Sequence, residues 1–165
     1  MAMHQLYLGG PLFDAGHRHH NLMLEAALIA RGRRVILPQR RALEFKNSGG
    51  FDLVAIALDC QKCCEDRNTI FVGCLDGPDA DSGTAVEYAY AMGATRRAIL
   101  YRTDFRTAPE KELGLNAMFR HPGATFIYFP AFFTESEAVE QFYRELALLI
   151  HEAALAIEAT EEGSD

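Results

Sequence analysis

The sequence lacks the features that mark a disordered, secreted or membrane-spanning chain. Only 6 of its 165 residues are proline, whereas 49% are hydrophobic and 24% are charged, so its composition lies outside the disordered class. No apolar run approaches the roughly 18 residues that a membrane span requires, and no basic and apolar leader opens the chain. We therefore expect a protein of the cytoplasm that has no membrane partner.

Basic residues are in the minority, with 16 Lys and Arg against 23 Asp and Glu and a formal net charge of -7. Because a nucleic-acid-binding protein needs a basic face, this balance argues against nucleic acid as a partner. Some arginines do cluster early in the chain, where a solvated surface and a nucleotide or partner site are both open explanations. They are Arg31, Arg33, Arg34, Arg40 and Arg41.

Cysteine is scarce and confined to positions 60–74, which is not the dispersed pattern of a disulfide-stapled secreted domain. The spacing of Cys60 and Cys63 suits a zinc or redox half-site, but no second pair and no nearby histidine complete it. We favour small core residues on a buried helical face, and leave the role of Cys60, Cys63 and Cys64 open. The incomplete half-site predicts no metal. The glycine pairs form no dinucleotide or phosphate fingerprint, so we expect no nucleotide cofactor, and the sequence indicates no other cofactor.

The length suits one domain, placed at residues 1–159, with an acidic tail at 160–165. Short apolar runs alternate with stretches of helical periodicity. The predicted strands are 5–9, 35–37, 70–75, 98–101 and 125–129, and the predicted helices are 22–30, 52–66, 84–92 and 136–159. Residues 53–58 alone also suit a strand, and Gly93 is expected to end the third helix. The alternation predicts an α/β fold with a five-stranded parallel sheet covered by helices on both faces.

Ligands of such sheets bind at the carboxyl ends of the strands, here the turns after Leu8, Leu75 and Tyr101. The turn after Leu75 and the helix that follows carry an unusual density of carboxylates. These are Asp76, Asp79, Asp81 and Glu87.

Two of these carboxylates are candidates for chemistry, and each has a structural alternative. Asp81 lies just before a predicted helix, where it could simply cap the backbone N–H groups. Glu87 lies one turn into that helix, so it either faces the cleft or is a surface glutamate that complements the helix dipole. The residues alone do not decide between these readings.

Three segments share their order and their residues with a known family. They are Tyr7-Leu-Gly-Gly-Pro-Leu-Phe13, Leu75-Asp-Gly-Pro-Asp-Ala-Asp-Ser-Gly-Thr-Ala-Val-Glu87-Tyr-Ala-Tyr-Ala91 and Leu115-Asn-Ala-Met118. Over residues 5–120 the chain thus resembles the nucleoside 2-deoxyribosyltransferase family, most specifically in the central segment. The resemblance implies a flavodoxin-like three-layer sandwich. It also implies an enzyme of deoxynucleosides and free nucleobases that holds the 2-deoxyribosyl group covalently on Glu87 between two displacements.

The resemblance also implies roles for other residues. Tyr7 hydrogen-bonds and orients the nucleophile, while Asp81 and Asn116 hold the sugar and its 5'-hydroxyl. The matching asparagine usually comes from a neighbouring subunit, so we expect a homo-oligomer whose size the sequence does not reveal. Gly9, Phe13 and Met118 are further expected contacts of the substrate, although Phe13 suits the core equally well.

The sequence departs from the family at the position that faces the base. An aspartate or asparagine is usual there, and ungapped counting places Gln61 at that position, with Asp59 as the alternative if the helix register differs. The usual Leu-Gly after the catalytic glutamate is replaced by Tyr88 and Ala89. His17, His19 and His20 lie near the expected base site, where surface histidines are the favoured explanation and base contact the alternative.

Two other functions compete with transfer. A related hydrolase would remove the base from a deoxynucleoside or its 5'-monophosphate, but Asp81 would repel a phosphate. A sensing module on the same fold would bind nucleosides without catalysis. The sequence does not reveal which bases are accepted or how transfer and hydrolysis are balanced.

Overall fold

The computed structural model describes residues 3–106 and 115–162. In this part of the chain, five strands pair in parallel in the order β2-β1-β5-β6-β7. They are β1 (Gln5–Gly9), β2 (Val35–Ile36), β5 (Thr69–Cys74), β6 (Ala98–Arg102) and β7 (Ala124–Tyr128). Counted along the chain this is the doubly wound order 2-1-3-4-5, which confirms the flavodoxin-like prediction.

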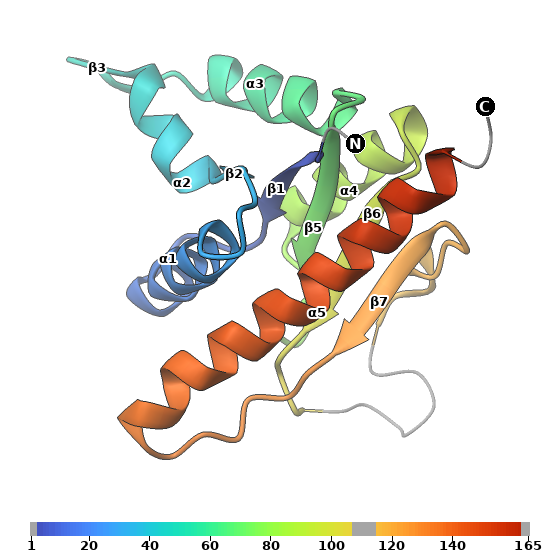
Figure 1. Ribbon diagram of the computed structural model, residues 1–165. Coiled ribbons are helices and arrows are strands. Elements are labelled where there is room, and N and C mark those ends of the chain that lie inside the picture. Colours follow the sequence, from blue (N-terminus) through green and yellow to red (C-terminus); the bar gives the residue numbers. More distant parts are fainter. Residues whose placement is uncertain (1–2, 107–114, 163–165) are drawn as a thin grey trace.

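Helices cover both faces of the sheet (Figure 1). They are α1 (Ala15–Ile29), α3 (Leu53–Glu65), α4 (Ser82–Ala94) and α5 (Ser136–Glu162). Helix α1 packs against α5, and α3 packs against α4. Because side chains alternate along a strand, Leu6 and Leu8 of β1 enter the core beneath α1 and α5, whereas Tyr7 enters the core beneath α3 and α4.

Local capping explains where the helices begin and end. Asp52 accepts a hydrogen bond from the Ala55 amide, which starts α3 at Leu53 and confirms the helix over the strand alternative. Gly93 does not end α4, which continues to Ala94. Helix α5 runs to Glu162, beyond the predicted end at residue 159, while residues 163–165 of the predicted tail lie outside the described residues.

The structure adds short elements between the predicted strand 35–37 and the predicted helix 52–66. They are α2 (Pro38–Arg41), the 3-10 turn Ala42–Phe45 and the antiparallel pair β3 (Lys46–Asn47) and β4 (Gly50–Phe51). Between the predicted strands 98–101 and 125–129 the structure has the 3-10 turn Ala117–Phe119, and residues 107–114 lie outside the described part of the chain. Among the described helices, none is long and apolar enough to cross a membrane.

Candidate active site

Tyr7 and Glu87, which are 80 positions apart in the sequence, are in direct contact. The Tyr7 hydroxyl donates a hydrogen bond of 2.6 Å to Glu87 Oε1. Tyr7 lies on a central strand and is 1% exposed, while Glu87 projects from α4 over the same face of the sheet. Strand β1 thus fixes the position of the Tyr7 hydroxyl, and the hydrogen bond from this hydroxyl orients the Glu87 carboxylate.

Gly9, at the end of β1, lies close to the Glu87 carboxylate and the Phe71 ring. A Cβ atom at position 9 would lie 2.8 Å from Glu87 Oε2 and 2.5 Å from Cε2 of Phe71. Both separations are shorter than real Cβ contacts, so any larger residue would displace the carboxylate or the ring. Glycine is therefore required here by close packing, whether or not its backbone also meets a substrate.

Burial sets the protonation of both partners. Burial raises the pKa of Glu87 to about 7; hydrogen bonds from Tyr7 and Cys60 lower it, and the charge of Asp81 raises it. Burial, followed by the charge of Glu87, raises the pKa of Tyr7 far above its ordinary value. Tyr7 therefore stays a protonated donor, whereas the Glu87 carboxyl changes charge near neutral pH.

Glu87 lines a cavity of about 390 Å³, which we call the Glu87 cavity. Its polar lining residues are Asp81, Thr84 and Glu87, from the start of α4, together with Arg18 and Gln39. Most of its other lining is apolar and includes Leu12, Phe13, Leu43, Phe51 and Ile56. A few polar groups in a largely apolar wall suit a ligand with one hydroxylated and one flat, weakly polar part.

The structure confirms that Asp81 caps α4, and it also places the Asp81 side chain in the wall of the Glu87 cavity. The cap is a 3.0 Å hydrogen bond that Asp81 Oδ2 accepts from the Thr84 amide. Phe13 lines the same cavity with 77% of its surface exposed, so its core alternative is wrong. Tyr7, Asp81, Glu87 and Phe13 are thus brought to one place.

Other predicted contacts lie elsewhere. Gln61 donates to Glu65 on the surface of α3 and lines a separate cavity with Asp59 and Arg41. Asp59 is paired with Arg41 at 2.5 Å, so neither candidate on α3 faces Glu87. Asn116 accepts from the Met118 amide, and neither residue lines the Glu87 cavity.

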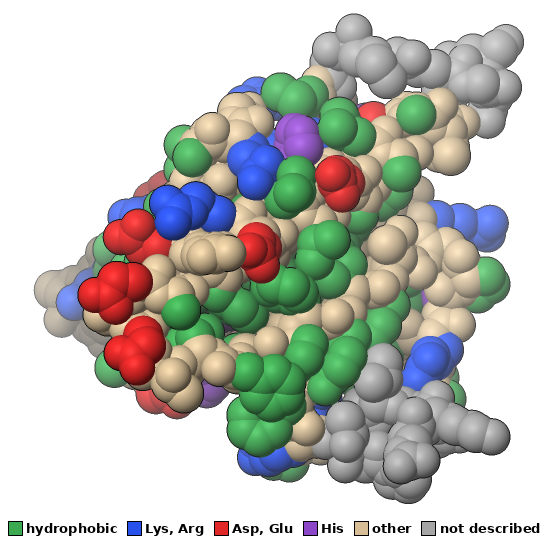
Figure 2. Space-filling model, turned by 60° about the horizontal axis from the view of Figure 1, so that its bottom comes forward, with side chains coloured by type: hydrophobic (Ala, Val, Ile, Leu, Met, Phe, Trp, Pro, Cys, Tyr) green, Lys and Arg blue, Asp and Glu red, His purple; other side chains and the backbone are tan. Residues whose placement is uncertain are grey.

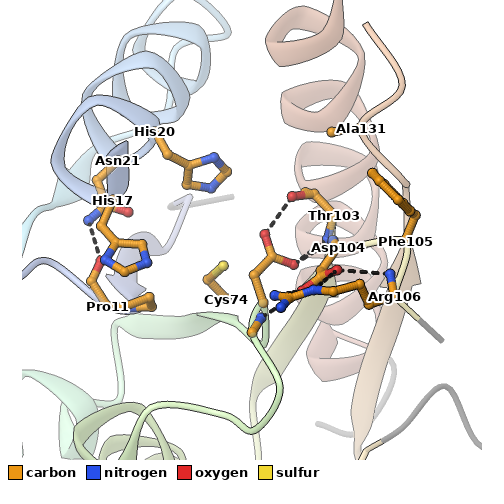
Figure 3. Close-up of a pocket in the computed structure, with 12 residues that line it drawn as sticks. Pro11, His17, His20, Asn21, Cys74, Thr103, Asp104, Phe105, Arg106 and Ala131 are labelled. Carbon is orange, nitrogen blue, oxygen red and sulfur yellow. Dashed lines mark hydrogen bonds and ion pairs between the residues drawn. The ribbon is translucent and has the colours of Figure 1, made fainter. Parts of the chain in front are cut away.

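A second cavity of about 360 Å³ lies by the turns after β5 and β6, where α1 faces Thr103 and Asp104 (Figure 3). Two histidines of α1, His17 and His20, line it, and His20 contacts the hydroxyls of Tyr101 and Tyr143 at 2.8 Å and 2.9 Å. Asp76 accepts from the Thr103 and Asp104 amides and ties the two turns together. These contacts give His20 and Asp76 structural roles, and neither residue lines the Glu87 cavity.

Sequence reasoning missed Cys60 as a site residue. It lines the Glu87 cavity from α3, on the same helical face as Leu53 and Ile56. The sequence predicted a buried helical face for Cys60, but it did not indicate that this face borders a cavity. The four cysteines are free thiols, and the described residues hold no cluster of three His, Cys, Asp or Glu that could bind a metal ion.

Comparisons with known proteins found one matching family model and solved structures of similar fold. The family model for nucleoside 2-deoxyribosyltransferase matches residues 6–118. A conserved protein from Enterococcus faecalis V583 has a similar structure, with a TM-score of 0.58 and 23% identity over 87% of this chain and 99% of that one. A 2-deoxyribosyltransferase from Bacillus psychrosaccharolyticus gives a TM-score of 0.57 and 22% identity over 82% and 90%. No curated protein matches the chain in a sequence search.

Proposed function

The chain belongs to the nucleoside 2-deoxyribosyltransferase family, and from that premise we propose that it transfers the 2-deoxyribosyl group between nucleobases, with Glu87 as the nucleophile. The observation that carries the proposal is the oriented carboxylate of Glu87, held by Tyr7 at 2.6 Å in the wall of a cavity. A carboxylate so placed is a competent nucleophile toward an oxocarbenium-like carbon.

The proposed reaction has two displacements. The ionised Glu87 attacks the anomeric carbon, the N-glycosidic bond breaks, and the base leaves with the bonding electron pair and takes up a proton. A nitrogen of the incoming base then attacks the same carbon, loses a proton and releases the carboxylate. Two inversions give net retention. Because Tyr7 holds Oε1, the other carboxylate oxygen is the one that we assign to the attack.

The polar and the apolar lining of the Glu87 cavity suit the two parts of a nucleoside. Asp81, the N-cap of α4, lines the same cavity as the nucleophile, so we assign it to a sugar hydroxyl. Phe13 and Ile56 supply apolar surface for the flat faces of a base. The negative charge of Asp81 favours a free 5'-hydroxyl over a 5'-phosphate, which supports nucleosides as substrates.

We further propose that a neighbouring subunit supplies Asn116. In its own chain this residue caps a surface turn and does not line the Glu87 cavity. Met118 beside it is 79% exposed, and Phe105 and Phe132 stack at 5.0 Å while remaining 56% and 68% exposed. Hydrophobic side chains also gather on the face displayed in Figure 2. Exposed apolar surface of this kind supports self-association in a closed homo-oligomer.

Incubating the purified protein with deoxyinosine and adenine tests the proposal. New deoxyadenosine, detected by chromatography, is the expected result. Free hypoxanthine without deoxyadenosine would instead indicate a hydrolase, and unchanged deoxyinosine would favour a sensing module. Glu87→Ala is the inactive control and Glu152→Ala, on the exposed side of α5, is the matched active control. A location in the cytoplasm stays a prediction.

A further inference from the structure

A buried asparagine of α1 joins two segments that are far apart in the sequence. The Asn21 amide donates to the Pro11 carbonyl, in the turn after β1, at 3.1 Å (Figure 3). The same amide nitrogen donates to Gln39 Oε1, on α2, at 3.2 Å. Because a side-chain amide has two N–H donors, these two bonds use both of them. Asn21 thus connects the turn after β1 to α2.

The other end of the Gln39 side chain is held as well. Gln39 is buried, and its Nε2 donates to the Arg18 carbonyl at 3.2 Å. Arg18 and Asn21 are three positions apart on α1 and therefore lie on the same side of that helix. The Gln39 amide accepts from one of these residues and donates to the other, so α1 fixes its orientation at both ends.

The segments joined by Asn21 form part of the wall of the Glu87 cavity. Gly10 and Leu12, on either side of Pro11, line this cavity, and so does Gln39. Asn21 itself lines the second cavity and not the Glu87 cavity. It can therefore affect a ligand beside Glu87 only through the groups that it holds.

We propose that Asn21 is a positioning residue of the Glu87 site, because its amide ties the turn after β1 to α2 and thereby fixes the wall that these two segments form. Without the amide, the Pro11 carbonyl and Gln39 Oε1 would each lose a donor, and a buried acceptor without a donor is costly. Both segments should then move to reach water. The effect on catalysis rests on the proposed function, but the hydrogen bonds do not.

A second contact between α1 and the same turn defines what Asn21 adds. Arg18 Nη1 donates to the Leu12 carbonyl at 3.3 Å, but Arg18 is exposed to solvent. Water competes with such a bond more readily than with the buried, shorter bond from Asn21 to Pro11. Loss of Asn21 should therefore displace the turn even though Arg18 remains.

Asn21→Leu tests the proposal, because it keeps a side chain of similar size and removes both donors. We expect KM for deoxyinosine to rise by about tenfold, since the binding wall moves. The value of kcat should change by less than about threefold, because Tyr7 and Glu87 keep their contact. An unchanged KM, or a loss that falls on kcat alone, would overturn the proposal.

Met23→Ala is the matched control for a general loosening of α1. Met23 lies on the same helix but packs against the core beneath α1 and α5, away from the bonds of Asn21. This variant should leave both KM and kcat unchanged. A rise in KM equal to that of Asn21→Leu would assign the effect to lost stability of α1 and contradict a positioning role.

Nitrogen-15 NMR tests the same arrangement without turnover. The backbone signals of Gly10 and Leu12 should shift in Asn21→Leu but not in Met23→Ala, and unshifted signals in Asn21→Leu would contradict the proposal. In the wild type, the Asn21 side-chain N–H groups should exchange slowly with solvent, because both are buried and bonded. Rapid exchange would overturn the proposal even if Asn21→Leu does not fold. A failed transfer assay would reject the proposed function, while these spectra would still decide the role of Asn21.

Discussion

Replacing Glu87 by glutamine should stabilise the fold relative to the wild type above neutral pH. Burial raises the pKa of Glu87 from 4.5 to about 7, so the folded chain binds this proton more tightly than the unfolded chain does. The wild type therefore loses stability as the pH rises from about 4.5 to about 7, where the buried carboxyl must ionise. At about 1.4 kcal/mol per pH unit the full effect is about 3 kcal/mol. We expect about 2 to 3 kcal/mol because the carboxylate also borders a cavity.

Urea unfolding, followed by circular dichroism at about pH 5 and about pH 8, measures this effect. The protein concentration must be held fixed, since self-association would add to the apparent stability. The free energy of unfolding of Glu87→Gln minus that of the wild type should be about 2 to 3 kcal/mol larger at about pH 8 than at about pH 5. Glu152→Gln, an exposed change on α5, should show no such gain. A difference that is independent of pH, or that favours the variant only in acid, would refute the argument from burial.

The remaining predictions concern activity. The value of kcat/KM should rise as the pH increases through about 7, because only the ionised Glu87 attacks; a decline over this range in a pH–rate profile would oppose its role as nucleophile. Deoxyinosine should react more than about tenfold faster than inosine, since a 2'-hydroxyl destabilises the oxocarbenium-like transition state; similar rates in the chromatographic assay would argue against the family chemistry. Mixing inactive Glu87→Ala with inactive Asn116→Ala should restore activity after subunit exchange, and no recovery despite demonstrated exchange would place Asn116 within its own site or outside it.

The order of elements was predictable because it depends on local patterns. Each buried strand is a short apolar run, and the caps at Asp52 and Asp81 fix where α3 and α4 begin. The antiparallel pair near Gly50 was not predictable, because it joins only two residues on each side and leaves no periodic signal. Gly93 shows that a single glycine does not fix a helix end, since α4 includes it and ends one residue later, at Ala94.

The sequence predicted a site residue correctly only where a family motif names it and the fold brings it to the Glu87 cavity. Tyr7 and Glu87 were identified by resemblance, and the strand and helix bring them together across 80 positions. Gln61 was placed by counting without gaps, which ignores the helical face of α3; Cys60, one residue earlier, points to the Glu87 cavity instead. A one-residue change rotates a side chain by about 100° around a helix, so counting cannot replace the register.

The role of Glu87 as the covalent nucleophile is tested most directly by trapping. The protein is incubated with a 2'-deoxy-2'-fluoro nucleoside, whose fluorine slows the second displacement, and is then analysed intact and after proteolysis by mass spectrometry. We predict one added fluorodeoxyribosyl group per active chain, on the peptide that contains Glu87, and none in Glu87→Ala. The same variant should lose more than about 10³-fold of the exchange activity. Label on another residue, or Glu87→Ala that keeps more than about a tenth of the activity, would contradict the assignment.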